Sequence, residues 1–367
     1  MPPVAIDSRR LPPLLAPPGA HAGSARITHR GANQSQRMAH NYTELSVMLV
    51  TLDDIRAAAT RIRGIARRTP VLEIELPARG VRRGGSLDPP ALALKCENLQ
   101  PSGAFKLRGA CNMVAQLQPA ARAAGVITYS SGNHGQAVTM VARSFGIPAV
   151  VVMPETAPQV KVEGIRHLGG EVIFAGRTSA DRKARAEELL AQRGLTMVPP
   201  FDHPWIIAGA GTVGLEILEQ CPHATTVFVP MGGGGQISGV SAAVKGMRGG
   251  VRVVGVEPAG AARMSASLAA EHPVTLERAS SIADGLLTLR PGDLTFAHVR
   301  AFVDEVVTVT DDEMIDAVRW LFREAHLVAE PSGAAATAAA LRAGVAGSVA
   351  VVSGGNVDPV AYASYIS

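Results

Sequence analysis

Residues 92–110 read LALKCENLQPSGAFKLRGA, and the interpretation of the whole chain starts from this stretch. Its apolar beginning predicts a strand, and Pro101-Ser-Gly103 predicts a turn. Phe105 and Lys106 then open a segment whose composition favours a helix. An isolated lysine is usually a solvated surface residue. A lysine just past such a turn can also be held at the mouth of a site, so its meaning depends on the other motifs.

Three further motifs follow predicted buried strands. Ser130-Ser-Gly-Asn-His-Gly135 precedes a predicted helix, and the unpaired N–H groups of a helix start suit a carboxylate. Gly232–Gly235 follows the apolar run VFVP, and a glycine backbone there can wrap an oxyanion. Ser353 ends the third strand and precedes two glycines. Each motif alone also has a simpler interpretation: an N-cap turn, a flexible turn, and a strand-end serine.

The glycines at 232–235 are expected to bind a single phosphate group. No Lys-Ser or Lys-Thr pair follows them, which argues against the phosphate loop of nucleoside-triphosphate enzymes. A lysine, a phosphate loop, Asn133 at a helix start and a serine after a buried strand form a consistent set. Together they indicate that Lys106 binds the aldehyde of pyridoxal phosphate covalently.

The region from Leu52 to the C-terminus carries these four motifs in an order that resembles the tryptophan-synthase-β-like group of pyridoxal-phosphate enzymes. It is most similar to the threonine/serine ammonia-lyases and serine racemases of that group. The resemblance implies a set of cofactor-binding residues: Phe105, Lys106, Asn133, Gly232, Gly233, Gly234, Gly235 and Ser353. It also implies a set of substrate-binding residues: Ser130, Ser131, Gly132, Asn133 and His134. Ser131 stands where racemases carry a proton-transferring serine, so it is a second catalytic candidate beside Lys106.

The resemblance implies elimination of water from a small β-hydroxy amino acid, threonine or serine, to give a 2-oxo acid and ammonia. Lys106 would remove the α-proton. A serine at position 353 facing the pyridine nitrogen would leave that nitrogen unprotonated and favour loss of the β-hydroxyl over transamination. The alternatives within the family are a 3-hydroxyaspartate ammonia-lyase, a dehydratase of hydroxyectoine catabolism, and a serine racemase. No regulatory domain follows Ser353, so we expect a catabolic role.

Short predicted strands alternate with helices from Gly125 to about Phe201, which is typical of parallel βαβ units. The predicted strands of this region are 126–129, 149–153, 171–174 and 196–198. We therefore predict an α/β fold with two lobes, each a mostly parallel sheet flanked by helices. A small substrate-binding domain is expected at 125–202, and a large cofactor-binding domain at 48–124 and 203–367. Residues 1–47 have no hydrophobic periodicity and are expected to be a disordered tail.

The composition, 47% hydrophobic and 18% charged, is that of an ordinary globular protein. No apolar run is long enough to cross a bilayer, so no membrane partner is expected. Most of the net charge of +4 comes from five arginines before residue 48, which argues against a nucleic-acid partner. Three cysteines without a CxxC spacing favour a reducing cytoplasm and argue against a zinc site. We also expect a homodimer or a higher homo-oligomer.

Two further features of the sequence suggest other ligands, a dinucleotide and a divalent cation. Gly209-Ala-Gly-Thr-Val-Gly214 matches the G-x-G-x-x-G dinucleotide fingerprint, but no long apolar strand precedes it and no acid lies about 20 residues on. A dinucleotide-dependent enzyme is therefore a remote alternative, with a non-catalytic binding protein behind it. Racemase-like relatives bind a divalent cation with a glutamate at Glu257, a nearby carbonyl and an acid six residues on. Arg263 holds that last position here, so an ion pair is favoured and no metal is predicted.

Overall fold

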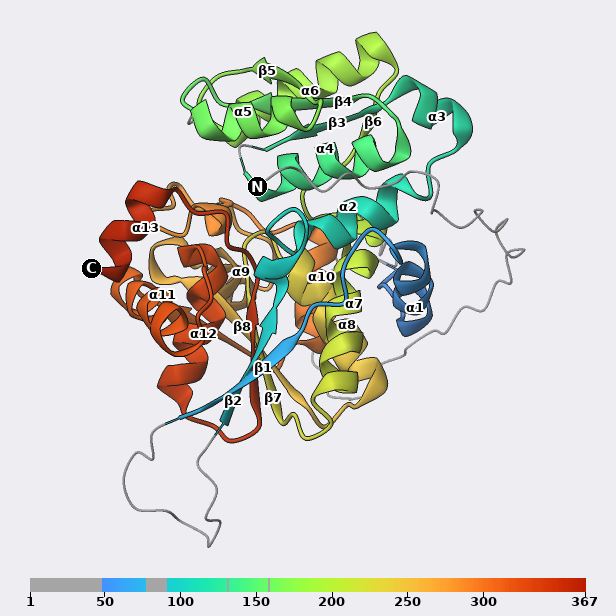
Figure 1. Cartoon of the computed structure of the whole chain (residues 1–367). Coiled ribbons are helices and arrows are strands. Elements are labelled where there is room, and N and C mark those ends of the chain that lie inside the picture. The colour runs from blue at the N-terminus through green and yellow to red at the C-terminus, as the bar shows by residue number, and fades with distance from the viewer. Residues whose placement is uncertain (1–47, 77–90, 131, 158) are drawn as a thin grey trace, which may run out of the picture. The chain divides into compact units, whose positions relative to one another are not determined.

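Two mostly parallel sheets organise the computed structural model, which describes residues 48–76, 91–130, 132–157 and 159–367. The large sheet has six strands in the order β1-β2-β10-β7-β8-β9, and the small sheet has four in the order β5-β4-β3-β6. Residues 49–367 form one compact unit, in which Figure 1 shows the small sheet above the large one. The predicted α/β class, with two sheets flanked by helices, is confirmed.

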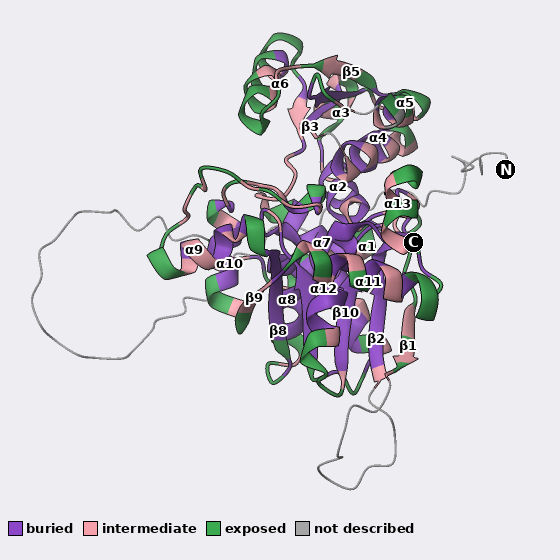
Figure 2. Cartoon of the chain, turned by 90° about the vertical axis from the view of Figure 1, so that its left-hand side faces the viewer, coloured by how far each residue is buried: buried purple, intermediate pink, exposed green. Residues whose placement is uncertain are grey.

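The large sheet joins strands from both ends of the chain: β1 (Val71–Glu75), β2 (Ala91–Cys96), β7 (Thr226–Pro230), β8 (Arg252–Pro258), β9 (Glu305–Val309) and β10 (Ser348–Val352). Neighbouring strands are parallel, except that β1 is antiparallel to β2, with Val71 opposite Lys95. Successive side chains of a strand point to opposite faces. Leu92 and Leu94 accordingly join one core cluster, whereas Ala93 joins another. Figure 2 shows that the strands in the middle of this sheet are buried.

Helices cover both faces of the large sheet, as a parallel sheet requires. Side chains of α11 (Asp311–Glu324) and α12 (Pro331–Ala343) pack on the face that holds Leu92 and Leu94. Side chains of α7 (Pro204–Gln220) and α8 (Gly235–Met247) pack on the other face. The carboxyl ends of β2, β7 and β10 therefore lead into the three loops that contain the lysine, glycine and serine motifs.

The small sheet contains β3 (Val126–Tyr129), β4 (Ala149–Met153), β5 (Glu171–Phe174) and β6 (Thr196–Met197), all parallel. The first three strands have the predicted bounds, and β6 is one residue shorter than predicted. The helices α4 (Asn133–Phe145), α5 (Gln159–His167) and α6 (Ser179–Arg193) alternate with these strands. This is the βαβ arrangement expected from the sequence.

The remaining helices are α1 (Leu52–Arg61), α2 (Lys106–Val114), α3 (Pro119–Ala124), α9 (Arg263–Ala270), α10 (Asp293–Phe302) and α13 (Pro359–Ile366), with short 3-10 helices at Glu97–Leu99, Ala259–Ala261 and Asp284–Leu286. α2 contributes to a core cluster shared with α4 and β3, and it also packs on α7. It therefore contacts elements on both sides of the predicted boundary at residue 124. The division into domains stays a prediction, and the expected tail at 1–47 lies outside the described residues.

The dinucleotide interpretation of Gly209–Gly214 is wrong, because the whole motif lies inside α7. A Cβ atom added to Gly209 would come within 2.5 Å of the Arg108 carbonyl oxygen in α2. Added at Gly214, it would come within 2.8 Å of Ala243 in α8. These glycines let three helices approach one another closely, and they do not form a loop that could receive a pyrophosphate.

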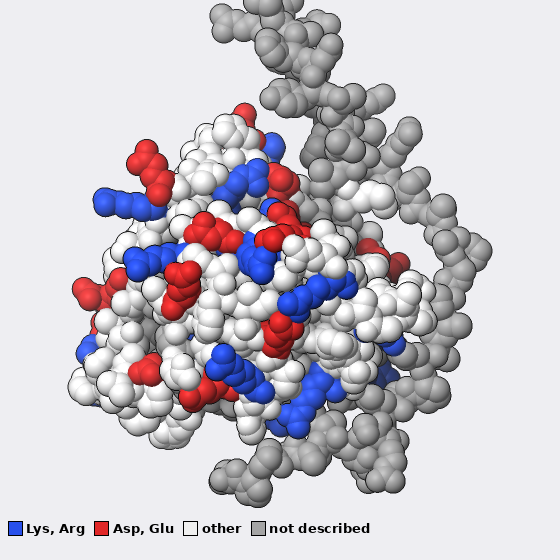
Figure 3. Space-filling model, turned by 90° about the horizontal axis from the view of Figure 1, so that it is seen from above, with Lys and Arg blue, Asp and Glu red and all other residues white. Residues whose placement is uncertain are grey.

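Charges of both signs are interspersed on the face seen from above the small sheet (Figure 3). On α6, for example, Arg185 forms an ion pair with Glu188 at 2.5 Å, and Arg193 reaches Glu171 of β5 at 2.8 Å. Among the described residues, no helix is both long and apolar enough to cross a membrane.

Candidate active site

Lys106 is the first residue of α2, and its loop is paired with the loop that follows β10. The Phe105 N–H group donates to the Ser353 carbonyl oxygen at 3.0 Å, and the Gly355 N–H group donates to the Gly103 carbonyl oxygen at 2.9 Å. Gly103 has a φ of +73°, a conformation that favours glycine. Two motifs that are about 250 residues apart in the sequence thus form an antiparallel bridge beside the lysine.

The Lys106 ammonium is partly buried and is held by neighbouring groups. Its Nζ atom donates to the Pro200 carbonyl oxygen at 2.6 Å and lies 5.1 Å from the centre of the Phe105 ring. Loss of hydration on burial lowers the pKa of Lys106 from 10.5 to about 8. A substantial fraction of Lys106 is therefore neutral near physiological pH, and the neutral amine is the form that acts as a nucleophile or base.

The glycine loop lies next to the segment that binds Lys106. Cβ atoms added to Gly233 and Gly235 would collide with Phe201, which directly follows Pro200. Gly234 has a φ of +100° and caps α8. Only glycine suits these positions, because the loop is packed tightly and one residue is in the left-handed region.

The carbonyl and N–H groups of this loop differ in whether they have hydrogen-bond partners. The Gly233 carbonyl oxygen accepts hydrogen bonds from the Thr295 hydroxyl at 2.6 Å and the Gly292 N–H group at 3.3 Å. Within the described part of the chain, the N–H groups of Gly232, Gly233 and Gly234 donate to no protein atom. Three unused donors at the start of the 13-residue helix α8 suit a phosphate group. The loop therefore fits the phosphate of pyridoxal phosphate.

Asn133 begins α4 and contacts residues at the start of α12 and in the loop after β10. Its Nδ2 atom donates to Glu330 Oε1 at 2.6 Å, and its Oδ1 atom accepts from Asn356 Nδ2 at 2.8 Å. A Cβ atom added to Gly354 would lie 2.2 Å from Glu330 Oε1, so Glu330 also lies against the loop that follows Ser353. Burial, with the nearby Asp284 charge, raises the pKa of Glu330 from 4.5 to about 8. Glu330 is thus a neutral acid at pH 7.

His134 follows Asn133 in α4 and lies close to the lysine. Its Nε2–H group donates to the Val198 carbonyl oxygen at 2.9 Å, and the ring is buried. Burial and the Lys106 charge lower the pKa of His134 to about 3, so the ring is neutral at physiological pH. The Gly132 N–H group donates to the Ser130 hydroxyl at 3.3 Å. Ser131 lies outside the described residues.

Ser353 directly follows β10, and its side chain is buried. Its hydroxyl lies 3.5 Å from the Ser332 carbonyl oxygen, at the limit of a hydrogen bond, and its N–H group donates to the Gly333 carbonyl oxygen at 3.3 Å. The hydroxyl has no stronger partner among the described residues, which leaves it able to bond to a ligand atom. Lys106, Asn133, the glycine loop and Ser353 are thus linked to one another through short contacts, while their roles stay predictions.

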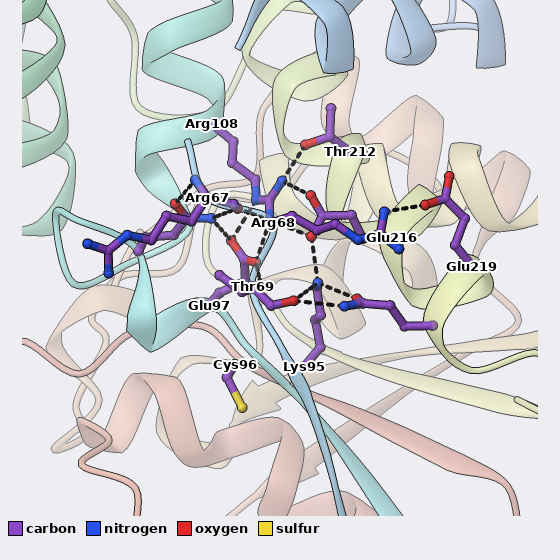
Figure 4. Close-up of polar contacts among 12 residues, drawn as sticks. Arg67, Arg68, Thr69, Lys95, Cys96, Glu97, Arg108, Thr212, Glu216 and Glu219 are labelled. Carbon is purple, nitrogen blue, oxygen red and sulfur yellow. Dashed lines mark hydrogen bonds and ion pairs between the residues drawn. The ribbon is translucent and has the colours of Figure 1, made fainter. Parts of the chain in front are cut away.

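A buried ion network anchors the helix that carries Lys106 (Figure 4). Arg108 of α2 binds both Glu97 oxygens at 2.7 Å and both Glu216 oxygens at 2.7 and 2.8 Å. Lys95 of β2 also binds Glu216, at 2.5 Å. Burial opposes the charge of Glu97, but the neighbouring Arg108 and Lys95 charges outweigh it and hold the pKa of Glu97 below its usual value. Two positive and two negative side chains balance here, so the network ties α2 to β2 and α7 without an unpaired buried charge.

Glu257 and Arg263, the two residues of the possible cation site, are both fully buried. The Glu257 carboxylate accepts hydrogen bonds from the N–H groups of Met264 and Ser265 at 2.8 and 3.0 Å, and from the Ser265 hydroxyl at 2.9 Å. Arg263 Nη1 lies 3.9 Å from Glu257 Oε1, which is an ion pair without a hydrogen bond. The expected ion pair is thus present, but the main role of Glu257 is to cap α9.

Several residues of this site escaped the sequence analysis. Glu330 and Thr295 contact the motif residues Asn133 and Gly233, yet neither belongs to a motif that was singled out. Arg108 lies in the stretch 92–110, but the sequence analysis gave it no role. Glu330 stands before Pro-Ser-Gly at a helix start, and an acid in such a turn was the one available signal. Thr295 could not have been found, because its partner Gly233 is 62 residues away. The same holds for the contact of Arg108 with Glu216, which is 108 residues away.

Glu330→Gln is expected to remove a pH dependence of stability. The folded protein keeps a proton on Glu330 between pH 4.5 and about 8, whereas the unfolded chain has released it, so stability falls as the pH rises through this window. Glutamine resembles the neutral acid, so the variant should melt like the parent near pH 5 and at a higher temperature above pH 8. Melting curves across this range, with the surface variant Glu155→Gln as control, measure the effect. A parent-like pH dependence in Glu330→Gln would show that Glu330 is already ionised at neutral pH.

Comparison with known proteins gives consistent matches along the chain. The family described as pyridoxal-phosphate dependent enzymes matches residues 62–354. An L-threonine ammonia-lyase of Thermotoga maritima is 41% identical over 313 residues, which cover 84% of this chain and 76% of that protein. A serine racemase of Schizosaccharomyces pombe is 38% identical over 331 residues, covering 88% of this chain and 99% of the racemase. The solved structure of maize serine racemase superposes with a TM-score of 0.79 at 35% identity, covering 86% of this chain and 97% of that one.

Proposed function

We propose, from the premise that the chain belongs to the family of pyridoxal-phosphate-dependent enzymes, that it eliminates water from a small β-hydroxy amino acid. Threonine and serine are the first candidates, and the products are a 2-oxo acid and ammonia. The observation that carries this proposal is the position of Lys106. Its partly neutral amine binds the Pro200 carbonyl, and the next residue, Phe201, packs against the glycine loop with its unused N–H groups.

Different residues of the chain are proposed to bind the cofactor and to remove the α-proton. The N–H groups of Gly232, Gly233 and Gly234 would hold the phosphate, and Lys106 Nζ would bind the aldehyde group. When bound, pyridoxal phosphate supplies an electron sink next to the substrate α-carbon. Lys106 Nζ, when free, would take the α-proton. The C–O bond to the β-hydroxyl would then break, and the hydroxyl would leave as water with the proton that Lys106 accepted. The released product tautomerises and is hydrolysed to the 2-oxo acid and ammonia.

The start of α4 is proposed to bind the substrate carboxylate. The N–H groups in its first turn lack helical partners, and the helix dipole favours an anion there. His134 supports this assignment in two ways. Its ring is neutral, so it offers no second positive charge that would compete for the substrate carboxylate. Its Nε2–H group donates to the Val198 carbonyl oxygen and thereby holds this turn in place. Ser130, Ser131 and Gly132 complete the proposed carboxylate site, and Asn133 is proposed to bond to the cofactor's ring hydroxyl.

The proposed domain roles follow from these positions. The large domain, residues 48–124 and 203–367, would bind the cofactor, since it contains the lysine, glycine and serine motifs. The small domain, residues 125–202, would bind the substrate carboxylate through α4. We also infer a cytoplasmic homodimer or higher homo-oligomer. The buried thiols of Cys96, Cys111 and Cys221, which are unpaired, support a reducing compartment.

Serine racemisation is the second candidate. It is favoured by the Schizosaccharomyces pombe relative and by a serine at position 131, the position that the family resemblance links to proton transfer in racemases. Both reactions begin with removal of the α-proton by Lys106. They differ in whether a proton returns to the α-carbon or the β-hydroxyl leaves.

A substrate panel tests the proposed function. The enzyme is expected to form 2-oxo acids from L-threonine or L-serine and none from L-alanine, which lacks the β-hydroxyl. 3-Hydroxyaspartate extends the panel to the other family substrate, and chiral analysis of the L-serine reaction detects D-serine. Formation of D-serine without 2-oxo acid would favour the racemase. A protein that binds pyridoxal phosphate but changes none of these amino acids would contradict both candidates.

A further inference from the structure

Arg263 is a fully buried cation whose guanidinium binds the backbone of the glycine loop. Its Nε and Nη2 atoms donate to the Gly232 carbonyl oxygen at 2.9 and 2.8 Å. Nη2 also donates to the Met231 carbonyl oxygen, and Nη1 donates to the Ala261 carbonyl oxygen. One side chain therefore draws three carbonyl oxygens towards a single point, with the Glu257 carboxylate 3.9 Å away.

These contacts determine the direction of the loop's N–H groups. In a planar trans peptide the C=O group and the following N–H group point in opposite directions. Because Arg263 holds the carbonyls of Met231 and Gly232, the N–H groups of Gly232 and Gly233 must point away from it. Thr295 holds the Gly233 carbonyl and turns the Gly234 N–H group in the same manner. Arg263 thus fixes two of the three donors that form the proposed phosphate site.

The oxygens around the guanidinium are of the kind that hard divalent cations bind. Three carbonyls and one carboxylate converge here, but a permanently charged guanidinium occupies their centre and would repel a metal ion. Among the described residues, no cluster of three or more His, Cys, Asp or Glu side chains could hold a metal either. The residues at Glu257 and Arg263 therefore do not fit a divalent cation.

We propose that Arg263 is a built-in cation that positions the glycine loop for the cofactor phosphate, in place of a metal ion that could dissociate. The proposal rests on the proposed function in one respect, namely that the loop binds pyridoxal phosphate. It assigns Arg263 a positioning role, because its guanidinium touches the loop's carbonyl oxygens and not the phosphate. Cofactor affinity is consequently independent of magnesium and calcium.

The test compares the parent holoenzyme with Arg263→Ala, Arg263→Lys and the control Arg248→Ala. Arg248 also donates to backbone carbonyls, those of Pro222 and Cys221, but at the far end of α8. The dissociation constant of pyridoxal phosphate is measured by absorbance titration, with melting temperatures as a second readout. Each protein is measured with excess chelator, with added magnesium, and with guanidinium chloride at tens of millimolar, well below denaturing concentrations.

The parent and Arg248→Ala are expected to bind the cofactor equally with or without chelator and magnesium. Arg263→Ala should bind it at least about tenfold more weakly, because the released carbonyls no longer orient the N–H groups, and guanidinium ions should restore part of the affinity. The cofactor affinity of Arg263→Lys should lie between those of the parent and Arg263→Ala. One ammonium group cannot bind three carbonyl oxygens with the fixed geometry of a guanidinium. This rescue by a free cation of the same shape separates positioning from general destabilisation.

Three results would overturn the proposal. One is parent-like cofactor affinity in both Arg263 variants. Another is parent affinity that falls with chelator and returns with magnesium. The third is a loss in Arg263→Ala that guanidinium leaves unchanged while Arg263→Lys binds like the parent. If Arg263→Ala does not fold, the cofactor affinity of Arg263→Lys and the parent's response to chelator still test the proposal. A parent protein that binds no pyridoxal phosphate would instead refute the proposed function.

Discussion

Lys106→Ala is expected to abolish turnover of every amino acid in the panel while leaving the protein folded. The variant lacks both the amine that anchors the cofactor and the base that takes the α-proton. General base catalysis alone contributes about 10²–10⁴-fold, so the combined loss should exceed about 10⁴-fold. Formation of 2-oxo acid measures turnover, and circular dichroism with thermal melting verifies the fold.

Lys183→Ala is the matched control, because Lys183 lies on the exposed side of α6 and, among the described residues, pairs only with Glu187, at 3.7 Å. It should keep full activity. Parent-like activity in Lys106→Ala would contradict the whole mechanism, since no other lysine of the described residues occupies this loop.

Gly234→Asp is expected to weaken binding of pyridoxal phosphate by at least about 100-fold. An aspartate at a φ of +100° is strained by about 1–3 kcal/mol, and its Cβ atom would lie 2.8 Å from Thr295. Its carboxylate would also repel the phosphate, by about 4 kcal/mol at 4 Å and an effective dielectric constant of 20. Together these effects exceed the roughly 2.8 kcal/mol that corresponds to 100-fold. Titration of the cofactor measures the loss.

Two further variants separate the causes. Gly234→Ala adds the strain and the collision without the charge, so its loss should be smaller. Gly64→Asp introduces an acid at another positive φ, +85°, where no atom lies within 4 Å, and should not change cofactor affinity. Unchanged binding in Gly234→Asp would mean that the phosphate is bound elsewhere.

The local patterns of the sequence predicted the fold well where each pattern has a single solution. Strands β3, β4 and β5 have their predicted bounds because each is a short apolar run between two turns. The loops after β2, β7 and β10 were connected in the sequence through their resemblance to one family, and the structure places them after three neighbouring parallel strands. The glycine loop in particular combines a strand, four glycines and a helix, an order that is typical of sites that bind a phosphate group.

Local patterns alone did not show what Gly209–Gly214 do, because their spacing matched a dinucleotide fingerprint that the missing strand and acid left only as a remote alternative. Those glycines serve helix packing against α2 and α8, and the partners Arg108 and Ala243 could not be known from the sequence. Glu330 was missed for a related reason. Its contact with Asn133 joins residues almost 200 positions apart, and its neutral state depends on burial that no single stretch reveals.

For Arg263, the sequence could not predict which partners its side chain binds. Its sequence position argued against a cation at Glu257, and the two residues were expected to pair with each other. The structure shows that the guanidinium binds carbonyls of the glycine loop more closely than it approaches Glu257. Side-chain direction decides between these two partners, and it follows from the packing of α9 against the loop and not from residue spacing.

The most direct test of the central claim is to locate the covalent link between the protein and its cofactor. The holoenzyme is reduced with borohydride, digested, and examined by peptide mass spectrometry. We predict that the reduced phosphopyridoxyl group is found on the peptide that contains Lys106, and that it is absent after the same treatment of Lys106→Ala. Labelling of a different lysine in the parent protein, or no labelled peptide from a protein with bound cofactor, would contradict the claim that Lys106 is the cofactor-binding residue.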